Sequence, residues 1–382
     1  MFGGYGNGQE IMPRVIHITV ARFRADLPKP GEPLDFLVTI HEEGTGISWQ
    51  QNIRVEPETE RYFLKLTREL YFWSKEQGLP PEKANQHVRE LGMRLYATFI
   101  GSQGAKILGN IKPTAVLFNI DETILNLPWE LIGAQDQMLS QQVPFGRLVT
   151  TRTIPRQGKD PLQEDTNVNI LAIANPTIDL AATEPEISSI KNLEGNHGSF
   201  SVKVDVLSKD DATRDRFTAM LAAGDYDIIH FAGHASFNPF EPESSALHFA
   251  DGLISADDAL NLPWKAPPYF VFNSACETGR AAGGERLVSE ENHTNGLAAA
   301  FLSAGVYGYA GYFWPVTDTG ASLFAKTFYG SLLSVQNVGL ALLHARKKTI
   351  SQLGQKGDLT GYSCVLFGDA ASKHRRDLFE AV

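Results

Sequence analysis

Hydrophobic and polar residues alternate in three segments near the start of the chain, as they do in strands with one buried face. The three segments are residues 14–23, 34–42 and 47–55. In residues 58–77 and 81–100 the apolar residues recur at helical spacing, and Pro81 suits the first turn of the second helix. An apolar strand at residues 114–120 and a helix beginning at Asp121 are expected next. The first part of the chain is therefore predicted to mix α and β elements.

Beyond residue 166 the pattern changes to strands that are apolar on both faces and that alternate with helices. Strands are predicted at residues 167–176, 201–208, 225–234, 266–275 and 306–316, and helices at 182–195, 212–224, 294–305 and 319–334. This alternation favours an α/β fold in which helices cover both faces of a mostly parallel sheet. The polar segment 156–167 separates the two parts, so we expect domains at residues 1–160 and 161–382.

Composition narrows the class of protein further. Of the 382 residues, 43% are hydrophobic and 20% are charged, which is typical of a globular chain. The formal net charge of −10, without a long Lys/Arg-rich run, gives no electrostatic footprint for nucleic acid. The start of the chain lacks the regions of a signal peptide, and no apolar run reaches the roughly 18 residues that span a bilayer. Two cysteines are too few for a disulfide framework. We therefore expect a cytoplasmic protein that binds neither nucleic acid nor membrane.

Two reactive side chains stand where predicted strands of the second part end. His234 closes the strand at residues 225–234, and Cys276 directly follows the strand at residues 266–275. Function in open parallel sheets gathers at the carboxyl ends of strands, so the two side chains are expected to lie close together. An imidazole beside a thiol raises the thiolate fraction and can protonate a leaving amine. A lone buried cysteine is more often inert and a lone histidine more often structural, so the residue pattern by itself leaves both interpretations open.

Small residues flank both candidates and leave room for a substrate backbone. Gly233 and Ala235 flank His234, and Ala275 precedes Cys276. Main-chain N–H groups that are free beside a nucleophile can hold the oxyanion of a tetrahedral intermediate. The N–H groups of Ala235 and Cys276 are the candidates for this oxyanion hole.

The sequence around both residues resembles the CHAT family of caspase-like cysteine peptidases, in the clan of caspases, separases and gingipains. Residues 230–255, HFAGHASFNPFEPESSALHFADGLIS, are similar to the histidine block of that family, and residues 272–285, FNSACETGRAAGGE, to its cysteine block. Four other similar segments are LNLPWELIG, NILAIANP, GLAAAFLSAGVYGYAGYFWPVTD and GYSCVLFGDA. The resemblance covers residues 127–370 and implies a caspase-like three-layer sandwich. It makes residues 1–160 a candidate for an inactive caspase-like or partner-docking subdomain.

By position, the resemblance implies that His234 is the catalytic histidine and Cys276 the nucleophile of an endopeptidase. The family commonly has Gly after the histidine, and this chain has Ala235, which is tolerated where φ is negative. In the wider clan, the residue two before the nucleophile and the strand after the next helix line the pocket for the substrate residue before the cut. Here these positions are Ser274, Trp314 and Val316, and charges could come from Asp251 and Asp318. The neutral Ser274 beside apolar walls predicts an uncharged or apolar substrate residue.

Two other candidates have plainer interpretations. His230 matches the strand histidine of the family and is expected to pack beside the dyad, with a role in the site as the alternative. Cys364 lies within an apolar run and is expected in the core. No HExxH, CxxC or phosphate-loop spacing occurs, so neither a metal nor a cofactor is expected.

Residues 279–295 form a polar, Gly-containing segment after the nucleophile and are predicted to be a mobile gate, or else a permanently flexible loop. The resemblance also implies an effector of bacterial defence or cell death. Its substrate would be a protein, such as a pore-forming protein or another protease zymogen, and a partner protein or self-oligomerisation would activate it. Two alternatives are a caspase-like interaction module with an idle cysteine and a transpeptidase or ligase that uses the same acyl-enzyme.

Overall fold

The computed structural model describes residues 14–22, 29, 31–76, 80–121, 124–134, 137–150, 167–197, 200–237, 244–275, 296–335 and 337–372. Cys276 and the gate predicted at residues 279–295 lie outside this part of the chain. Within it, none of the helices combines the length and the apolar character that crossing a membrane requires.

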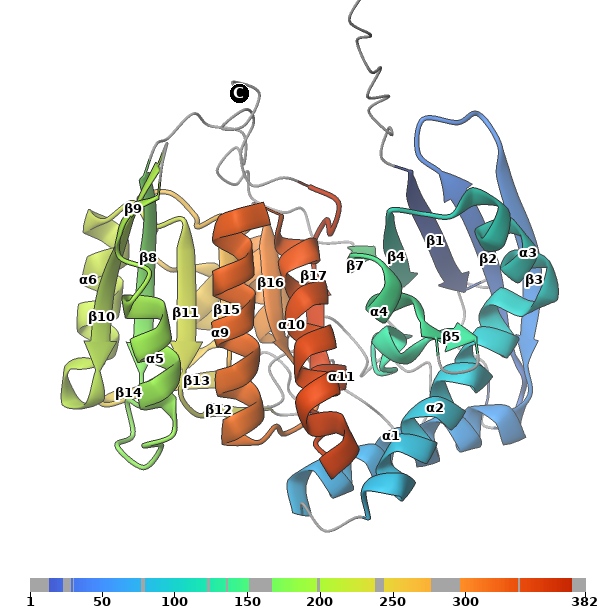
Figure 1. Cartoon of the computed structure of the whole chain (residues 1–382), viewed down its shortest axis with the longest axis horizontal. Coiled ribbons are helices and arrows are strands. Elements are labelled where there is room, and N and C mark those ends of the chain that lie inside the picture. The colour runs from blue at the N-terminus through green and yellow to red at the C-terminus, as the bar shows by residue number, and fades with distance from the viewer. Residues whose placement is uncertain are drawn as a thin grey trace, which may run out of the picture.

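One twelve-stranded sheet runs through the molecule in the order β3-β2-β1-β4-β7-β17-β16-β15-β11-β8-β10-β9 (Figure 1). The first part of the chain supplies β1 (Val15–Arg22), β2 (Leu34–Glu42), β3 (Ser48–Val55), β4 (Ala115–Asp121) and β7 (Phe145–Thr150). The second part supplies β8 (Asn167–Ala174), β9 (Gly195–His197), β10 (Phe200–Ser208), β11 (Ile228–Ala232), β15 (Phe270–Asn273), β16 (Gly308–Tyr312) and β17 (Cys364–Phe367). Two small sheets join β12 (Ala235–Ser236), β13 (Ala246–Phe249) and β14 (Gly252–Ser255), and β5 (Gly133–Ala134) and β6 (Gln137–Met138).

The sheet is mostly parallel, which confirms the predicted fold class. Strands β10, β8, β11, β15 and β16 all pair in parallel, and only β9 and β17 run against their neighbours on this side. All residues of β11, β15 and β16 are buried, because helices cover both faces of the sheet here. Strands that are buried on both faces need unbroken runs of apolar residues, which is the pattern from which these strands were predicted.

The longer helices are α1 (Pro57–Glu76), α2 (Pro81–Leu95), α3 (Gly101–Ile111), α5 (Thr183–Lys191), α6 (Arg214–Ala223), α9 (Asp318–Val335) and α10 (Val338–Leu353). The shorter ones are α4 (Leu139–Gln142), α7 (Ala256–Leu260), α8 (Leu297–Ser303) and α11 (Thr360–Ser363). Between α2 and α3 the chain forms one π-helical turn, Tyr96–Ile100, and Gly101 takes a positive φ of 63° that a side chain would strain.

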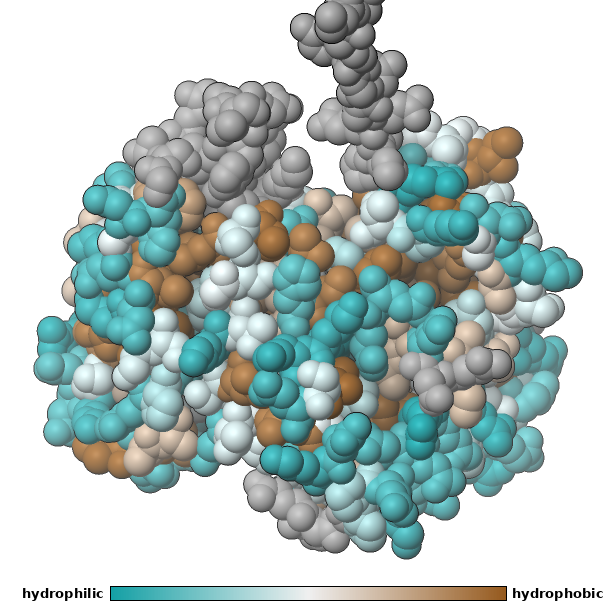
Figure 2. All heavy atoms as spheres, viewed as in Figure 1, coloured by the Kyte–Doolittle hydropathy of each residue, from teal (hydrophilic) through white to brown (hydrophobic). Residues whose placement is uncertain are grey.

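Two apolar layers hold these helices on the sheet. Ile187, Phe324 and Ala341 come from α5, α9 and α10 and belong to one layer, and these helices lie in front of the strands in Figure 1. The other layer contains Phe217 of α6 and Phe301 of α8, and it continues into the helices of the first part. The outward surface around α1 and α2 is mainly hydrophilic in Figure 2, as expected for helices that bury only one face.

The prediction of a helix that begins at Asp121 is wrong. Strand β4 extends to Asp121, and the described residues after it form only 3₁₀ turns, one that includes Ile124 and one at Trp129–Leu131. Pro128 explains the difference, because a proline disfavours helical backbone in the residue before it. The buried Trp129 then closes the turn by donating its indole N–H to the carbonyl of Ile124.

A buried ion pair lies where the two parts of the sheet meet. Arg147 of β7 donates its Nε–H to Oε1 of Glu130 at 2.8 Å and also bonds Oε2 and the carbonyls of Leu125 and Leu127. Directly after the next strand, β17, the backbone N–H of Gly368 donates to the carbonyl of Arg147 at 2.9 Å. The regions on either side of residue 160 therefore share one sheet, and their division into two domains stays a prediction.

We expect Glu130→Ala to lower the free energy of unfolding by about 3–5 kcal/mol, because it leaves a buried guanidinium without its carboxylate. Replacing both partners, Glu130→Leu with Arg147→Met, should recover most of this loss. Equilibrium urea unfolding measures both effects. The control is Glu42→Ala, which breaks the surface pair with Arg14 and should change stability far less. Equal losses for the two single variants would contradict the structural role of the buried pair.

Candidate functional site

The parallel register between β11 and β15 brings the two predicted strand ends together. Phe231 of β11 pairs with Asn273 of β15. His234 and Cys276 each follow their member of this pair by three residues. Because parallel strands rise at nearly the same rate per residue, both chains leave the sheet at the same level and at the same edge.

Hydrogen bonds fix the main chain up to the last described residue before the cysteine. The N–H of Ser274 donates to the carbonyl of Phe231 at 2.8 Å, which extends the contact with β11 past the end of the strand. The N–H of Ala275 donates to Oδ1 of Asn273 at 3.1 Å, and Nδ2 of Asn273 donates to the hydroxyl of Tyr309 at 3.0 Å. Asn273 is fully buried, so this side chain holds the exit of β15 in place.

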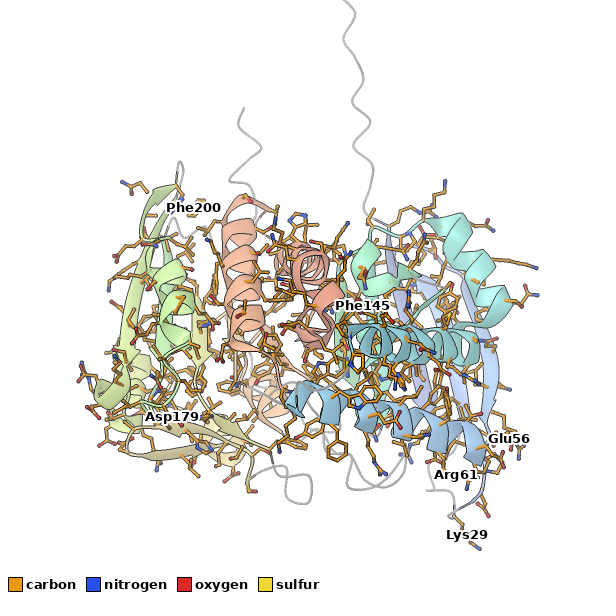
Figure 3. The ribbon with its side chains drawn as sticks, turned by 60° about the horizontal axis from the view of Figure 1, so that its bottom comes forward. Lys29, Glu56, Arg61, Phe145, Asp179 and Phe200 are labelled. Carbon is orange, nitrogen blue, oxygen red and sulfur yellow. The ribbon has the colours of Figure 1, made fainter. Side chains whose placement is uncertain are left out.

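His234 pairs with an acid that the sequence analysis did not select. Its Nε2 lies 2.9 Å from Oδ2 of Asp179, and both side chains are partly open to solvent, at 42% and 62% exposure. No described residue bonds Nδ1 of His234, so that nitrogen is left for proton exchange. Figure 3 turns this edge of the molecule toward the viewer and labels Asp179 there.

The pKa of Asp179 is lowered, first by the hydroxyl of Thr177, which donates to its other oxygen, and then by His234. The carboxyl therefore stays ionised to lower pH than an ordinary aspartate. An ionised acid on Nε2 stabilises an imidazolium and fixes the orientation of the ring.

The loop that carries Asp179, residues 175–180, follows β8 and has a constrained backbone. Asn175 and Ile178 take positive φ values of 46° and 67°, which are uncommon for any side chain and an outlier for a β-branched one. The N–H of Asn175 donates to the carbonyl of Ala232 at 2.8 Å, and the N–H of Leu180 donates to Oδ1 of Asn175 at 2.9 Å. These bonds hold the loop against the end of β11.

Gly233 allows this close approach. A Cβ at Gly233 would lie 3.0 Å from Cδ of Pro176 in the loop and 2.9 Å from the ring of Phe231. Any side chain would therefore push the loop away from β11, and with it Asp179 from His234.

His248 of β13 lies next to His234, with ring centroids 6.4 Å apart. Burial lowers the pKa of His248, and the neighbouring His234 lowers it further. The second ring therefore stays neutral at ordinary pH and does not compete with His234 for the charge of Asp179.

The backbone at Ala235 suits an oxyanion contact. The N–H of His248 donates to the carbonyl of His234 at 3.0 Å, so the facing residues Ala235 and Leu247 form the kind of antiparallel pair that exchanges no hydrogen bonds. The N–H of Ala235 is therefore not used by β13. Its φ is not positive, so the methyl group in place of the usual glycine introduces no strain.

The residues predicted to line a substrate pocket lie in different surroundings. Ser274 is half-buried, and its Oγ has no hydrogen-bond partner among the described residues. Trp314 is fully buried and donates its indole N–H to the carbonyl of Leu359 at 3.4 Å. Asp251 accepts the backbone N–H of Arg214 at 2.7 Å, and Asp318 is the exposed first residue of α9. Only Ser274 therefore lies at the end of β15, and the pocket stays a prediction.

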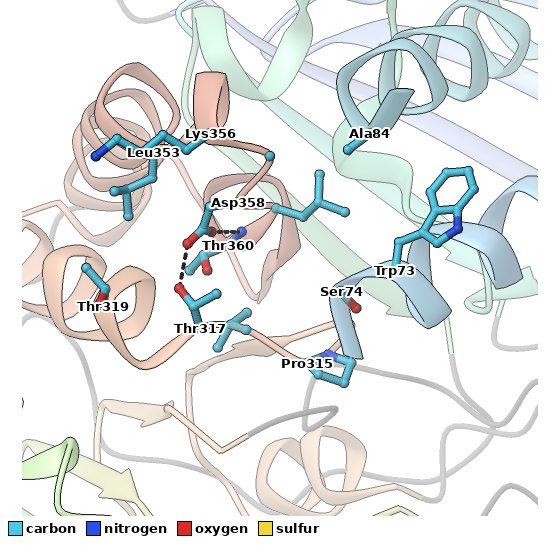
Figure 4. A pocket seen from close by; sticks show the side chains of 13 residues that line it. Trp73, Ser74, Ala84, Pro315, Thr317, Thr319, Leu353, Lys356, Asp358 and Thr360 are labelled. Carbon is cyan, nitrogen blue, oxygen red and sulfur yellow. Dashed lines mark hydrogen bonds between the residues drawn. The ribbon is translucent and has the colours of Figure 1, made fainter. Parts of the chain in front are cut away.

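Val316 lines a cavity of about 410 Å³ between the first and second parts of the chain (Figure 4). Trp73 and Ser74 of α1 and Ala84 of α2 form one side of it. On the other side, Asp358 accepts hydrogen bonds from the hydroxyl of Thr317 and the backbone N–H of Thr360. Val316 and its neighbours in the cavity follow β16 in the chain. Strand β16 is the neighbour of β15, which leads to Cys276, so the cavity is not at the end of β15.

Cys364 and His230, for which packing in the interior was expected, are both buried. Cys364 is in the core as expected, and burial raises the pKa of its thiol to about 12. His230 has no exposed surface and lies between Glu186 and Tyr329. Within the described ranges, no three His, Cys, Asp or Glu side chains gather as metal ligands would.

Asp179 and His248 were missed for different reasons. Asp179 follows the apolar strand β8 and so stands at a third strand end on the same edge, a signal that the strand-end rule could have found. His248 arrives through the β13–β14 hairpin, and its spacing in the sequence gives no such signal.

Comparison with known proteins identifies the family and the fold. The profile of the CHAT domain family matches residues 89–376, more than half of the chain. No curated protein matches the chain. Two structures of the separase–securin complex of Saccharomyces cerevisiae, at 3.0 and 2.6 Å resolution, are similar, with TM-scores of 0.60 and 0.51 and identities of 11% and 12%. Both matches cover 93% of this chain and 30% of the other, so this chain spans less than a third of the separase chain.

A complex of the pro- and mature domains of RgpB from Porphyromonas gingivalis gives a TM-score of 0.43 at 9% identity, over 82% of this chain and 77% of the other. At such low identities the likeness to the separase structures establishes the fold alone, which is that of caspase-like peptidases. The match to the family profile goes further, and the chain belongs to the CHAT family.

Proposed function

We propose that this protein is a cysteine endopeptidase in which Cys276 is the nucleophile and His234 the general acid and base. The observation that carries the proposal is the register of Phe231 with Asn273, which gives both residues the same offset from neighbouring parallel strands. The pairing of His234 with Asp179 supports it, because a histidine held by an acid is what a proton-transfer role needs.

In the proposed reaction, His234 takes the proton of the Cys276 thiol, and the thiolate attacks the carbonyl carbon of the substrate. The imidazolium then gives its proton to the amine as the C–N bond breaks, which leaves a thioester on Cys276. Water, deprotonated by His234, attacks the thioester and releases the carboxylic acid and the free thiol. Asp179 on Nε2 leaves Nδ1 as the nitrogen that exchanges these protons.

The oxyanion formed in each half of this reaction needs hydrogen-bond donors. The backbone N–H groups of Ala235 and Cys276 are our candidates. The first is supported by the absence of a bond from Ala235 to β13. The second rests on sequence position, because Cys276 lies outside the described residues.

The pocket for the substrate residue before the cut is proposed to accept an uncharged side chain. Ser274, two residues before the nucleophile, offers a hydroxyl that is otherwise unbonded among the described residues. Asp251 already accepts a backbone hydrogen bond at the start of α6, so it is less suited to hold a substrate cation.

The setting of a bacterial defence or cell-death effector, with a protein substrate and an activating partner or self-oligomer, is also proposed, from the resemblance alone. The separase neighbours are crystal structures of complexes with securin, which is a protein partner of separase. The competing function is a caspase-like interaction module with an idle cysteine. The ionised Asp179 on His234 favours the enzyme, because a binding module has no need to orient an imidazole.

We expect a peptide fluoromethyl ketone to add once to the native protein, with loss of fluoride and formation of a carbon–sulfur bond. The adduct should form in Cys364→Ala, which keeps the proposed nucleophile, and should be missing from Cys276→Ala, which keeps the buried thiol. Intact-protein mass spectrometry measures both, in dilute buffer and in concentrated sulfate, which favours compact and associated states. A folded wild type that stays unlabelled in both would support the idle module.

We expect Asp179→Asn to lower kcat on a peptide substrate by about tenfold, less than for a buried triad acid, because Asp179 is exposed and screened. KM should change little, since the carboxylate acts on the imidazole and not on the substrate. Thr177→Val is the matched control, because it removes one hydrogen bond to Asp179 but keeps the carboxylate of Asp179 beside His234. Steady-state kinetics separates the two constants, and a loss confined to KM would argue against an orienting role.

We expect a positional-scanning peptide library to show preference for uncharged or apolar residues before the cleaved bond. The reason is the neutral Ser274 at the predicted pocket. Strong selection for Arg or Lys would overturn this assignment and would require an acid from elsewhere in the site.

A further inference from the structure

A second acid–histidine pair lies in the interior of the protein, deeper than the pair of Asp179 and His234. Nε2 of His230 is 3.0 Å from Oε1 of Glu186, and Nδ1 of His230 is 3.0 Å from the hydroxyl of Tyr329. All three side chains are almost completely buried, at 0%, 3% and 1% exposure for His230, Glu186 and Tyr329. They come from β11, α5 and α9, so the cluster joins a strand to two helices of one face.

The protons in this cluster are constrained by its burial. Desolvation and the charge of Glu186 raise the pKa of Tyr329 well above its ordinary value, so the phenol keeps its proton. The contact between Nε2 and Oε1 is short but lacks the alignment of a good hydrogen bond, and neither atom has another partner among the described residues. A buried carboxylate is costly unless it is paired, so Glu186 needs His230 to remain at this place.

The same two segments carry the exposed pair. On β11 and its extension, His234 follows His230 by four residues, and on the loop and α5, Glu186 follows Asp179 by seven. The ring of His230 also stacks on Phe272 of β15, with centroids 5.3 Å apart at an interplanar angle of 28°. The buried cluster is therefore in contact with both strands of the candidate site and with the helix that follows the Asp179 loop.

The loop needs such support because its backbone is strained. Two non-glycine residues, Asn175 and Ile178, hold positive φ values, a state that persists only where the surrounding structure over-determines it. The bonds to Ala232 and within the loop hold its first half. Its other end runs through residues 181 and 182 into α5, which Glu186 attaches to β11.

We infer that Glu186, His230 and Tyr329 are positioning residues that hold α5, and with it Asp179, in register with His234. The inference rests on the proposed peptidase function, since it assigns the cluster a task in orienting the catalytic imidazole. It also assigns His230 a role that its position in the sequence leaves open. A purely structural cluster would stabilise the fold without acting through Asp179.

A double-mutant cycle separates these two roles. We expect Glu186→Ala to lower kcat about tenfold with KM unchanged within twofold, and Glu186→Gln, which keeps the size of the side chain and a polar atom beside Nε2, to recover part of that loss. In an Asp179→Asn background the same Glu186→Ala change should have little further effect, because the group that it positions is already gone. Ile190→Val, a buried change on the same helix without a polar role, is the control for stability and should leave kcat unaltered.

Fully additive losses in this cycle, with an active wild type, would overturn the inference and leave the proposed function intact. A folded wild type that neither cleaves peptides nor reacts with the fluoromethyl ketone would instead remove the proposed function.

Amide hydrogen exchange tests the positioning without any activity. Glu186→Ala should raise the exchange rates of the Asn175 and Leu180 amides at least tenfold, since both donate bonds that hold the loop. Glu184→Gln, which loses only the exposed pair with Lys209, should leave them unaltered. If Glu186→Ala does not fold, Glu186→Gln and Tyr329→Phe are measured in its place, with smaller increases expected. Unaltered exchange in every folded variant of the cluster would overturn the inference.

Discussion

The parallel register between β11 and β15 is the constraint on which the candidate site depends. Side chains alternate between faces along a strand, so a slip of one residue would exchange the two apolar layers and would turn His230 away from Glu186 and Tyr329. The bond from Ser274 to Phe231 continues this register past the end of β15, and Asn273 secures the following residue. Rigid strands therefore set the level at which the two segments before the proposed catalytic residues leave the sheet.

The first part of the chain contributes to the site from a distance. Strand β17 would be an edge of the sheet without β7, and an unpaired edge strand exposes a row of backbone N–H and C=O groups. Arg147 secures this junction through Glu130, and its guanidinium lies over the rings of Phe313 and Phe367, 5.7 Å from each centroid. Phe313 directly follows β16, the neighbour of β15. The buried ion pair thus supports the strand beside the one that leads to Cys276, which gives the first part a structural task whether or not it also docks a partner.

The sequence was sufficient for nine of the twelve strands of the main sheet and for the family, because apolar runs and ordered motifs are local properties. It was insufficient wherever the answer depended on contacts between distant segments. The place of β17 between β16 and β7 is one example, since β17 is the last strand among the described residues and β7 belongs to the first part of the chain. Trp314 is another, because its apolar neighbours fit a pocket wall as well as the core in which it lies. Asp179 is different, since it could have been found at the end of a predicted strand but needed the fold to identify its partner.

The two acid–histidine pairs divide positioning from reactivity by their depth. Polar groups in the interior meet no competing water, so Glu186 and His230 hold their segments together over a short distance. At the surface, water screens the attraction between Asp179 and His234, and the ring remains free to exchange protons and to move with a substrate. A strong exposed pair would lock the imidazole, and a weak buried pair would leave the strained loop unsupported. The arrangement therefore supplies rigidity from the pair that cannot reach solvent and keeps adaptability in the pair that would meet the peptide bond in the proposed function.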